Sequence, residues 1–314
     1  MNQVRSPLFY VGDKYKLMPQ LTKLFPHNIK TFYDVFAGGG SASLNTVANK
    51  YVLNDIDSHI MGLHKYLATE LQEPEKFFEH ELNIIDDYGL SHSAENVYPR
   101  NIKDLKAKYK KTYFSKANKS AYIKLRDAYN YDNSRMDLLY LLLVFGFNHM
   151  TRFNSSGMFN LPVGNVDWNS NVEAALKLYA NFVNTLSVEY NCEDFETFVN
   201  DISFNKGDFL YFDPPYLITF SEYNKLWNHE TDLRLFRLLD ALSKTDINWG
   251  LSNVLSHKGR KNEMLREWAA RYNVYPIKSN YISKFDNTIK EDTKEVYITN
   301  YKFKEWIYVS AVLP

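Results

Sequence analysis

Short runs of aromatic and β-branched residues alternate along the chain with longer stretches whose apolar positions recur at helical spacing. The runs lie at 31–36, 51–55, 209–212, 247–252 and 295–300. Turn residues border each run, which is typical of strands, and helical spacing is clearest at 231–242 and 260–271. Strands that alternate with helices predict an α/β fold with a doubly wound, largely parallel sheet.

The interval 59–199 interrupts this alternation. It is rich in helix-like stretches, includes a strongly basic run, and carries a glycine- and proline-containing patch at 148–164. Because these features differ from the flanking pattern, we predict that 59–199 is an inserted, mainly helical second domain. The α/β domain is then divided into a first part at 1–58 and a second part at 200–314.

The composition is that of an ordinary soluble globular protein. The chain has 314 residues, of which 45% are hydrophobic and 24% charged, enough for one large or two modest domains. The single cysteine, Cys192, excludes an internal disulfide. An apolar N-terminal segment of signal-peptide type and a membrane-spanning apolar stretch are both absent from the sequence. We therefore expect a cytoplasmic protein with no membrane partner.

Positive charge is concentrated in one segment of a chain whose net charge is zero. Between Arg100 and Arg135 lie eleven Lys or Arg residues but only three Asp or Glu residues, and tyrosines are interleaved with them. This mixture is expected where a phosphate backbone is neutralised and bases stack on aromatic rings. A lysine-rich run is also compatible with a plain solvated helix face. If the segment binds DNA, we expect Lys106, Lys110 and Lys111 to contact it.

The first candidate site is a glycine turn followed by an acid at the end of the next strand. The turn is F-A-G-G-G-S at 36–41, and N-D-I-D at 54–57 places Asp55 after the second strand. Glycine lets a ligand approach the backbone closely, and an acid at this point accepts hydrogen bonds from ribose hydroxyls. Ser43 breaks the dinucleotide pattern and the chain has no phosphate-loop motif. A cofactor with a ribose but no pyrophosphate is therefore favoured, and S-adenosylmethionine fits.

The second candidate site is D-P-P-Y at 213–216, directly after an apolar run. Prolines can simply end a strand, but Asp213 and the carbonyl of Pro214 can each accept one N–H of an exocyclic nucleobase amine. The nitrogen is then drawn toward tetrahedral geometry, and its lone pair is directed at the methyl donor. Pro214 and Pro215 fix φ, and Tyr216 offers a face for a flipped-out base. Such catalysis needs positioning and electrostatics but no metal.

These motifs, in this order around an insertion, resemble the Dam-type adenine-N6 methyltransferases of DNA over nearly the whole chain. The resemblance implies that S-adenosylmethionine is bound by residues of the glycine turn and of both strand ends, namely Phe36, Gly38, Gly40, Asp55 and Asp213.

Two further segments of the resemblance imply cofactor contacts. S-P-L-F-Y-V-G-D-K at 6–14 is similar to the family's P-L-x-W-A-G-G-K box, which implies that Tyr10 and Lys14 contact the methionine end of the cofactor. Tyr10 replaces the family's tryptophan, and Asp13 replaces its second glycine. C-E-D-F at 192–195 implies that Asp194 and Phe195 hold the adenine of the cofactor.

The patch at 152–164, R-F-N-S-S-G-M-F-N-L-P-V-G, is similar to the family's DNA-contacting hairpin. The inserted domain is therefore expected to recognise the target, and Arg152, Asn154 and Ser156 are expected at the DNA. W-G-L-S-N at 249–253 and K-E-V-Y-I-T-N at 294–300 are similar to two late strands of the family.

The resemblance implies a site-specific adenine-N6 methyltransferase that acts on double-stranded DNA. Cytosine-N4 methylation is an alternative, although Ser is commoner at position 213 in that branch. A catalytically silent DNA-binding protein is another alternative, as is methylation of RNA or of a protein amide, where Asn replaces Asp213. Restriction-modification, phage and epigenetic settings stay open. A cognate restriction endonuclease is a candidate partner, and a monomer or weak dimer is expected.

Overall fold

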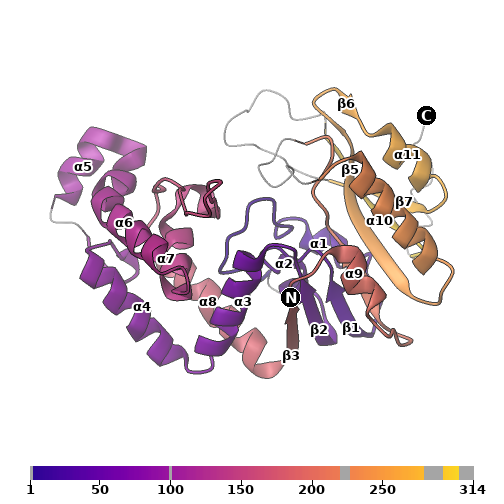
Figure 1. Cartoon of the computed structure of the whole chain (residues 1–314), viewed down its shortest axis with the longest axis horizontal. Coiled ribbons are helices and arrows are strands. Elements are labelled where there is room, and N and C mark those ends of the chain that lie inside the picture. The colour runs from indigo at the N-terminus through magenta and orange to yellow at the C-terminus, as the bar shows by residue number, and fades with distance from the viewer. Residues whose placement is uncertain (1–2, 99–100, 220–226, 279–292, 304–314) are drawn as a thin grey trace. The chain divides into compact units, whose positions relative to one another are not determined.

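The computed structural model describes residues 3–98, 101–219, 227–278 and 293–303, which form two compact units (Figure 1). The helical unit consists of Met1–Tyr15, Gly38–Leu44 and Asp57–Cys192. The sheet unit consists of Lys16–Ala37, Asn45–Ile56 and Glu193–Pro314. Both units are therefore assembled from segments that are far apart in the sequence.

A mostly parallel sheet forms the centre of the sheet unit. Its strands are β1 (Ile29–Asp34), β2 (Ala48–Asn54), β4 (Phe209–Phe212), β5 (Asn248–His257), β6 (Arg260–Lys261), β7 (Asn273–Ile277) and β8 (Lys294–Thr299). They follow the order β2-β1-β4-β5-β8-β7, with β6 paired to β5. The pairs β1–β2, β1–β4 and β4–β5 are parallel, whereas β8 runs antiparallel to β5 and β7. The predicted α/β class is confirmed.

The sheet is covered on both faces, which explains why β4 is apolar at every position. Phe209 and Tyr211 lie on one face, with ring centroids 5.1 and 5.2 Å from that of Phe25. Leu210 and Phe212 point to the opposite face and pack into the core formed with α10. The helices of this unit are α1 (Met18–Leu21), α9 (Phe195–Asn200), α10 (His229–Leu242) and α11 (Glu263–Ala269).

The helical unit is built around α7 (Met136–Phe145), whose sequence M-D-L-L-Y-L-L-L-V-F is buried from Asp137 to its last residue. A helix that is apolar all round is stable only inside a core. The other long helices are α3 (Ser58–Glu70), α4 (Pro74–Tyr88), α5 (Ile102–Tyr109), α6 (Tyr113–Tyr131) and α8 (Ser170–Thr185). α2 (Ser41–Asn45) begins in this unit, and β3 (Ser187–Asn191) ends it.

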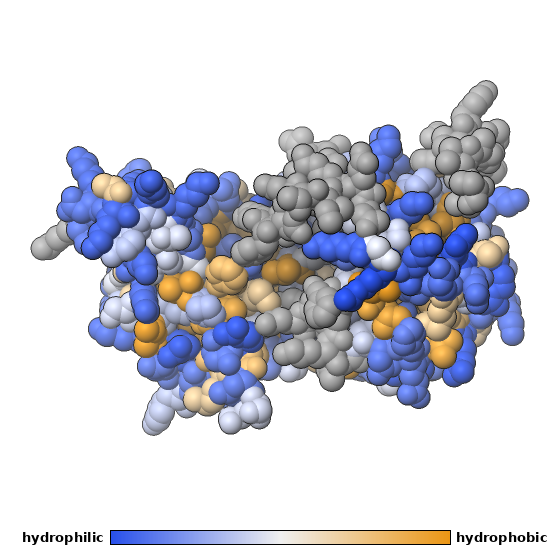
Figure 2. All heavy atoms as spheres, turned by 90° about the horizontal axis from the view of Figure 1, so that it is seen from above, coloured by the Kyte–Doolittle hydropathy of each residue, from blue (hydrophilic) through white to orange (hydrophobic). Residues whose placement is uncertain are grey.

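The described part of the helical unit also contains three short 3-10 helices, η1 (Ser93–Glu95), η2 (Lys110–Thr112) and η3 (Phe147–His149). Hydrophilic residues cover most of the visible face at the end that carries α5 and α6, on the left of Figure 2. Within the described residues, no helix combines the length and the apolar character needed to cross a membrane.

The segment after η3 folds back on itself as a hairpin. Antiparallel bridges join Gly146 to Val163 and Phe153 to Phe159. At the tip, the N–H of Asn154 donates to the carbonyl of Met158 at 2.9 Å. The left-handed conformation of Gly157, with φ of 73°, closes the turn.

Candidate active site

The glycine turn and the N-terminal box pack against each other within the helical unit. A Cβ atom added to Gly39 would lie 2.7 Å from the Cβ of Tyr10, and one added to Gly38 would lie 3.0 Å from the Tyr10 ring. Gly38 also has a φ of 47°, a conformation that costs little only for glycine. The turn therefore needs glycine to accommodate Tyr10 as well as any ligand.

A buried histidine that the sequence analysis did not single out holds the carbonyl of Gly38. The Nε2 of His64, on α3, lies 2.8 Å from this oxygen. Its Nδ1 lies 2.9 Å from the hydroxyl of Tyr179, which is 3.1 Å from the hydroxyl of Tyr190. Burial lowers the pKa of His64 to about 4, so the imidazole is neutral. Nε2–H then donates to Gly38, and Nδ1 accepts from Tyr179.

Asp13 ties the N-terminal box to the start of α2. Its carboxylate accepts a hydrogen bond from the N–H of Tyr15 at 3.3 Å and one from the hydroxyl of Ser41 at 3.4 Å. Burial raises the pKa of Asp13, and the nearby Arg5 partly offsets this. The neighbouring Lys14 is only 4% exposed, and lysine is almost never this buried unless it is paired.

Asn54 joins three segments at one edge of the sheet unit. Its Nδ2 donates to the carbonyls of Val35 at 3.2 Å and Glu193 at 3.0 Å, and its Oδ1 accepts from the N–H of Glu193 at 3.0 Å. Its own carbonyl accepts from the N–H of Ala37 at 2.8 Å. The Asn54 side chain is buried, so water cannot reach its polar atoms. These protein hydrogen bonds satisfy them instead.

The residues bonded to the side chain of Asn54, and Asn54 itself, each precede an expected cofactor ligand in the chain. The ligands in question are Phe36, Asp55 and Asp194. The structure therefore brings these three together, although they come from distant parts of the sequence. The signal that could have revealed Asn54 is an amide at the end of an apolar strand.

Asp194 and Phe195 are part of a charged and aromatic cluster. The carboxylate of Asp194 caps α9 through the N–H of Glu196 at 3.0 Å and lies 2.7 Å from Nη2 of Arg234. The Arg234 guanidinium lies 5.0 Å from the centroid of the Phe195 ring. That ring is 5.4 Å from the ring of Phe36. Both expected adenine ligands thus contact side chains of the same unit.

Asp213 directly follows β4, in the middle of the sheet. The strand order reverses direction between β1 and β4, which lie side by side while their following strands, β2 and β5, lie on opposite sides. Doubly wound sheets bind their ligands at the carboxyl ends of strands at this point. Because Phe36 lies just beyond the end of β1 and Asp213 just beyond the end of β4, both are at this position.

The hydroxyl of Tyr216 is in contact with two carboxyl groups. It lies 2.9 Å from Oδ1 of Asp213 and 3.4 Å from Oε1 of Glu295 on β8. The Tyr216 side chain is 8% exposed, and Glu295 is 2% exposed. Burial, together with the charge of Asp213, raises the pKa of the adjacent Tyr211. The hydroxyl thus has a structural partner, while the stacking role of the ring stays a prediction.

The expected DNA-contacting residues of the hairpin have different local roles. The Arg152 side chain crosses the hairpin, donating from Nε to Oδ1 of Asn160 at 2.9 Å and from Nη2 to the Asn160 carbonyl at 2.7 Å. Oδ1 of Asn154 accepts from the N–H groups of Ser156 and Met158, at 3.0 and 2.9 Å. Asn154 therefore builds the tip, and Ser156 is exposed on it.

The expected phosphate-contacting lysines lie on α5 and η2. All three are exposed. The ammonium of Lys106 is 5.3 Å from the ring centroid of Tyr98 and 5.1 Å from that of Tyr113. The carbonyl of Lys111 accepts a hydrogen bond from Nδ2 of Asn165. The backbone of this segment is thus anchored, while its ammonium groups reach the surface.

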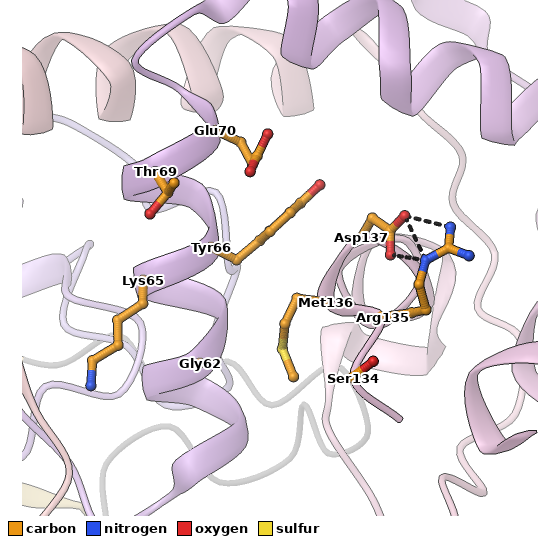
Figure 3. Close-up of a pocket in the computed structure, with 9 residues that line it drawn as sticks. All are labelled: Gly62, Lys65, Tyr66, Thr69, Glu70, Ser134, Arg135, Met136 and Asp137. Atoms are coloured by element: carbon orange, nitrogen blue, oxygen red, sulfur yellow. Dashed lines mark hydrogen bonds and ion pairs between the residues drawn. The ribbon is translucent and has the colours of Figure 1, made fainter. Parts of the chain in front are cut away.

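A pocket on the helical unit lies between α3 and the start of α7 (Figure 3). It is lined by Gly62, Lys65, Tyr66, Thr69, Glu70, Ser134, Arg135, Met136 and Asp137. Arg135 and Asp137 form a two-point ion pair with distances of 2.6 and 2.9 Å. None of the residues expected at the cofactor or the target base lines this pocket. Among the described residues, no group of three or more His, Cys, Asp or Glu side chains is arranged to hold a metal ion.

Residues 10–282 match the family model of the D12 class N6 adenine-specific DNA methyltransferases. The chain belongs to this family, which confirms the resemblance inferred from its motifs. A modification methylase, StsI of Streptococcus sanguinis, is 33% identical over 96% of this chain and 43% of its own length. The type II methyltransferase M.FokI of Planomicrobium okeanokoites is 34% identical over 95% of this chain and 43% of its own length.

The chain spans less than half the length of these two relatives. A third relative is similar in size to the chain. This is the type II methyltransferase M1.LlaDCHI of Lactococcus lactis subsp. cremoris, which is 24% identical over 93% of this chain and 94% of its own length. The sequence of this relative therefore aligns with the chain almost from end to end.

Proposed function

We propose that the chain transfers a methyl group from S-adenosylmethionine to N6 of an adenine that is flipped out of duplex DNA. The observation that carries this proposal is the position of Asp213. It follows β4 where the strand order reverses, and the hydroxyl of Tyr216 fixes its carboxylate. Membership of the D12 class supports adenine as the target.

The described residues fit the proposed cofactor. In the sheet unit, Asp55 supplies a carboxylate for the ribose hydroxyls, and Asp194 and Phe195 suit the adenine, since an acid accepts from its amine and a ring packs on its face. Asn54 gathers the segments that carry them. In the helical unit, the candidates are Tyr10, Lys14, Gly38 and Gly40. When bound, S-adenosylmethionine supplies an electrophilic methyl group on a sulfonium.

The residues of D-P-P-Y act on the amine of the target base. Asp213 and the carbonyl of Pro214 each accept one N–H, so that the nitrogen lone pair projects out of the base plane. Pro214 and Pro215 restrict the backbone that presents these acceptors. Formation of the new N–C bond would be matched by cleavage of the bond between the methyl group and the sulfonium sulfur, which leaves a neutral thioether. The nitrogen would lose one proton, and the Asp213 carboxylate can accept it. Alignment and electrostatics therefore account for the rate enhancement.

The inserted region, which we place at 59–199 between catalytic parts at 1–58 and 200–314, is proposed to bind the DNA. The hairpin presents Arg152 and Ser156, and the exposed lysines of α5 and η2 suit phosphates. Relatives named as modification methylases and type II methyltransferases support a restriction-modification setting. In that setting the enzyme acts in the cytoplasm, as a monomer or weak dimer, alongside a cognate restriction endonuclease.

The test is expression in a host that lacks adenine methylation, followed by digestion of its DNA to nucleosides. We expect N6-methyladenine with the wild-type chain and none with Asp213→Ala, which should lower the rate by several orders of magnitude while cofactor binding changes less. Appearance of N4-methylcytosine would establish the cytosine alternative. DNA binding without any modified base would identify a silent DNA-binding protein.

A further inference from the structure

We propose that Asn130 and Asn165 are positioning residues that hold the hairpin at 152–164 in register with α6, and that they thereby set how sharply the enzyme discriminates its recognition sequence. The inference deepens the proposed function and rests on it, because that function assigns the bases to the hairpin and the phosphates to the lysines of α5 and η2. Both asparagines belong to the helical unit, and each joins the hairpin segment to one end of α6.

Asn130 lies in the last turn of α6 and pairs with one hairpin residue through both polar atoms of its side chain. Its Nδ2 donates to the carbonyl of Phe159 at 3.0 Å, and its Oδ1 accepts from the N–H of Phe159 at 2.8 Å. A side-chain amide has the same donor and acceptor as a peptide group. Asn130 therefore pairs with the hairpin as a neighbouring strand would.

The ladder of the hairpin explains why Phe159 presents both groups to α6. Two ladder hydrogen bonds, each 2.9 Å long, run from the N–H of Asn154 to the carbonyl of Met158 and from the N–H of Asn160 to the carbonyl of Arg152. They flank the bridge between Phe153 and Phe159, which is therefore a non-hydrogen-bonded pair of an antiparallel ladder. The N–H and C=O of Phe159 point away from the opposite strand, and Asn130 satisfies them.

Aromatic contacts hold the same part of the hairpin against two helices. The Phe159 ring is 1% exposed and meets the ring of Tyr129, the residue before Asn130, edge to face at 6.1 Å. On α3, the imidazole of His59 stacks on the Phe153 ring with centroids 3.9 Å apart. The hairpin therefore cannot shift along α6 without breaking both the amide pair and the ring contacts.

Asn165 directly follows the hairpin and joins it to the other end of α6. Its Oδ1 accepts from the N–H groups of Phe114 and Ser115, in the first turn of the helix, at 3.0 and 3.3 Å. Its Nδ2 donates to the carbonyl of Lys111, one of the lysines proposed to contact phosphates. Because Asn165 is exposed, water can replace these bonds in part, and they should contribute less than those of Asn130.

The two contacts fix the spacing between phosphate binding and base reading. α6 has 19 residues and is therefore about 28 Å long. Phosphate contacts place a protein on the duplex, whereas base contacts specify the sequence. A loosened hairpin should lower the rate at the cognate site, where its base contacts are formed. The rate at a site with a changed base pair should fall less, because some of these contacts are already lost there.

The test compares Asn130→Leu, which keeps the volume but removes both hydrogen bonds, with Asn165→Ala. Single-molecule sequencing of DNA from a host that lacks adenine methylation and expresses the wild type first defines the recognition sequence. Single-turnover rates are then measured on that duplex and on duplexes with one changed base pair. The ratio of the two rates should fall about 10-fold in Asn130→Leu and about 3-fold in Asn165→Ala. Dissociation constants for a random duplex and for S-adenosylmethionine should stay within about twofold of wild type.

The matched control is Asn184→Leu. This change removes another side-chain amide bond of the helical unit, from Nδ2 of Asn184 on α8 to the carbonyl of Leu71 at 2.9 Å, and should leave discrimination unchanged. Hydrogen exchange of the ligand-free protein adds a readout that does not depend on activity. The amides of 152–164 should exchange faster in Asn130→Leu than in wild type or in the control.

Unchanged discrimination in both hairpin variants would overturn the proposal, and so would an equal loss of affinity for cognate and random DNA. If Asn130→Leu does not fold, Asn165→Ala decides alone, because its side chain is exposed. Absence of N6-methyladenine from the wild-type DNA would mean that the proposed function fails. Normal wild-type methylation with unchanged discrimination in the variants would reject the inference alone.

Discussion

Removing the imidazole of His64 tests whether the glycine turn is held by the buried hydrogen bonds that the structure shows. In His64→Leu, the carbonyl of Gly38 and the hydroxyl of Tyr179 each lose their hydrogen bond to the imidazole, while the Tyr179 hydroxyl keeps its contact with Tyr190. Each lost hydrogen bond contributes about 0.5–1.5 kcal/mol, so the free energy of unfolding should fall by about 1–3 kcal/mol. His64→Gln can donate and accept in similar directions and should lose only about 1 kcal/mol.

The pH dependence of stability isolates the protonation state of His64. Burial lowers its pKa from 6.5 to about 4 in the folded protein, so the unfolded chain binds the proton more readily between these values. Stability should therefore fall as the pH drops through this window. At about 1.4 kcal/mol per pKa unit, the loss attributable to His64 is about 3 kcal/mol at the acidic end.

Urea unfolding curves of wild type and His64→Gln at about pH 7 and about pH 4.5 measure how much His64 contributes to the pH dependence of the free energy of unfolding. Carboxylates titrate in both proteins, so only the difference between their pH dependences reports on His64. We expect the wild type to lose more stability than the Gln variant on acidification. Tyr179→Phe, which keeps the histidine, should retain the wild-type pH dependence. Equal acid sensitivity of wild type and His64→Gln would refute a buried, neutral imidazole.

Three further predictions concern the cofactor and the DNA. Asp55→Ala should weaken S-adenosylmethionine binding by about 1–3 kcal/mol in titration calorimetry, because a charged acceptor for the ribose is lost; an unchanged affinity would place the ribose elsewhere. Neutralising Lys106, Lys110 and Lys111 together should weaken binding to cognate and random duplexes equally and flatten the salt dependence, whereas a loss confined to cognate DNA would mean that they read bases. The resemblance to the Dam-type enzymes implies a basic residue at the position of Ser156 in members that methylate GATC. Ser156 has one hydroxyl and cannot make a bidentate contact with guanine, so single-molecule sequencing should find N6-methyladenine at a site other than plain GATC. N6-methyladenine confined to every GATC would refute this expectation.

The elements that the sequence predicts correctly are those whose signal is local. The run 209–212 coincides with β4, and the helical stretch from 231 lies within α10. Boundaries shift where pairing decides them. β5 continues to His257, beyond the predicted end at 252, because it pairs with β8 and β6 along that extension.

Elements with a weak local pattern were missed. β7 contains Pro276 and only one fully buried residue, Ile277, so neither alternation nor a continuous apolar run marks it. It is a strand because β8 offers it a partner, from Asn273↔Thr299 to Ile277↔Glu295. No short window of the sequence contains that information.

The side chains that fix the candidate site were missed for the same reason. The motifs identified Asp55 and Asp213 from their own neighbours in the chain. The residues that hold the motifs in place, in contrast, have distant partners: Asn54 bonds to a residue 139 positions away, His64 to one 115 away, and Tyr216 to one 79 away. Periodicity marks a position as buried but does not say what it will bond to.

A physical rule nevertheless connects Asn54 and His64. Where a strand ends and a functional turn begins, the backbone leaves the ladder, and its buried carbonyls need other partners. His64 satisfies Gly38, and Asn54 satisfies Val35. Each is a polar side chain within an otherwise apolar segment, placed where burial would be costly unless it were bonded. Such residues near a recognised motif are therefore the first places to look for the groups that orient it.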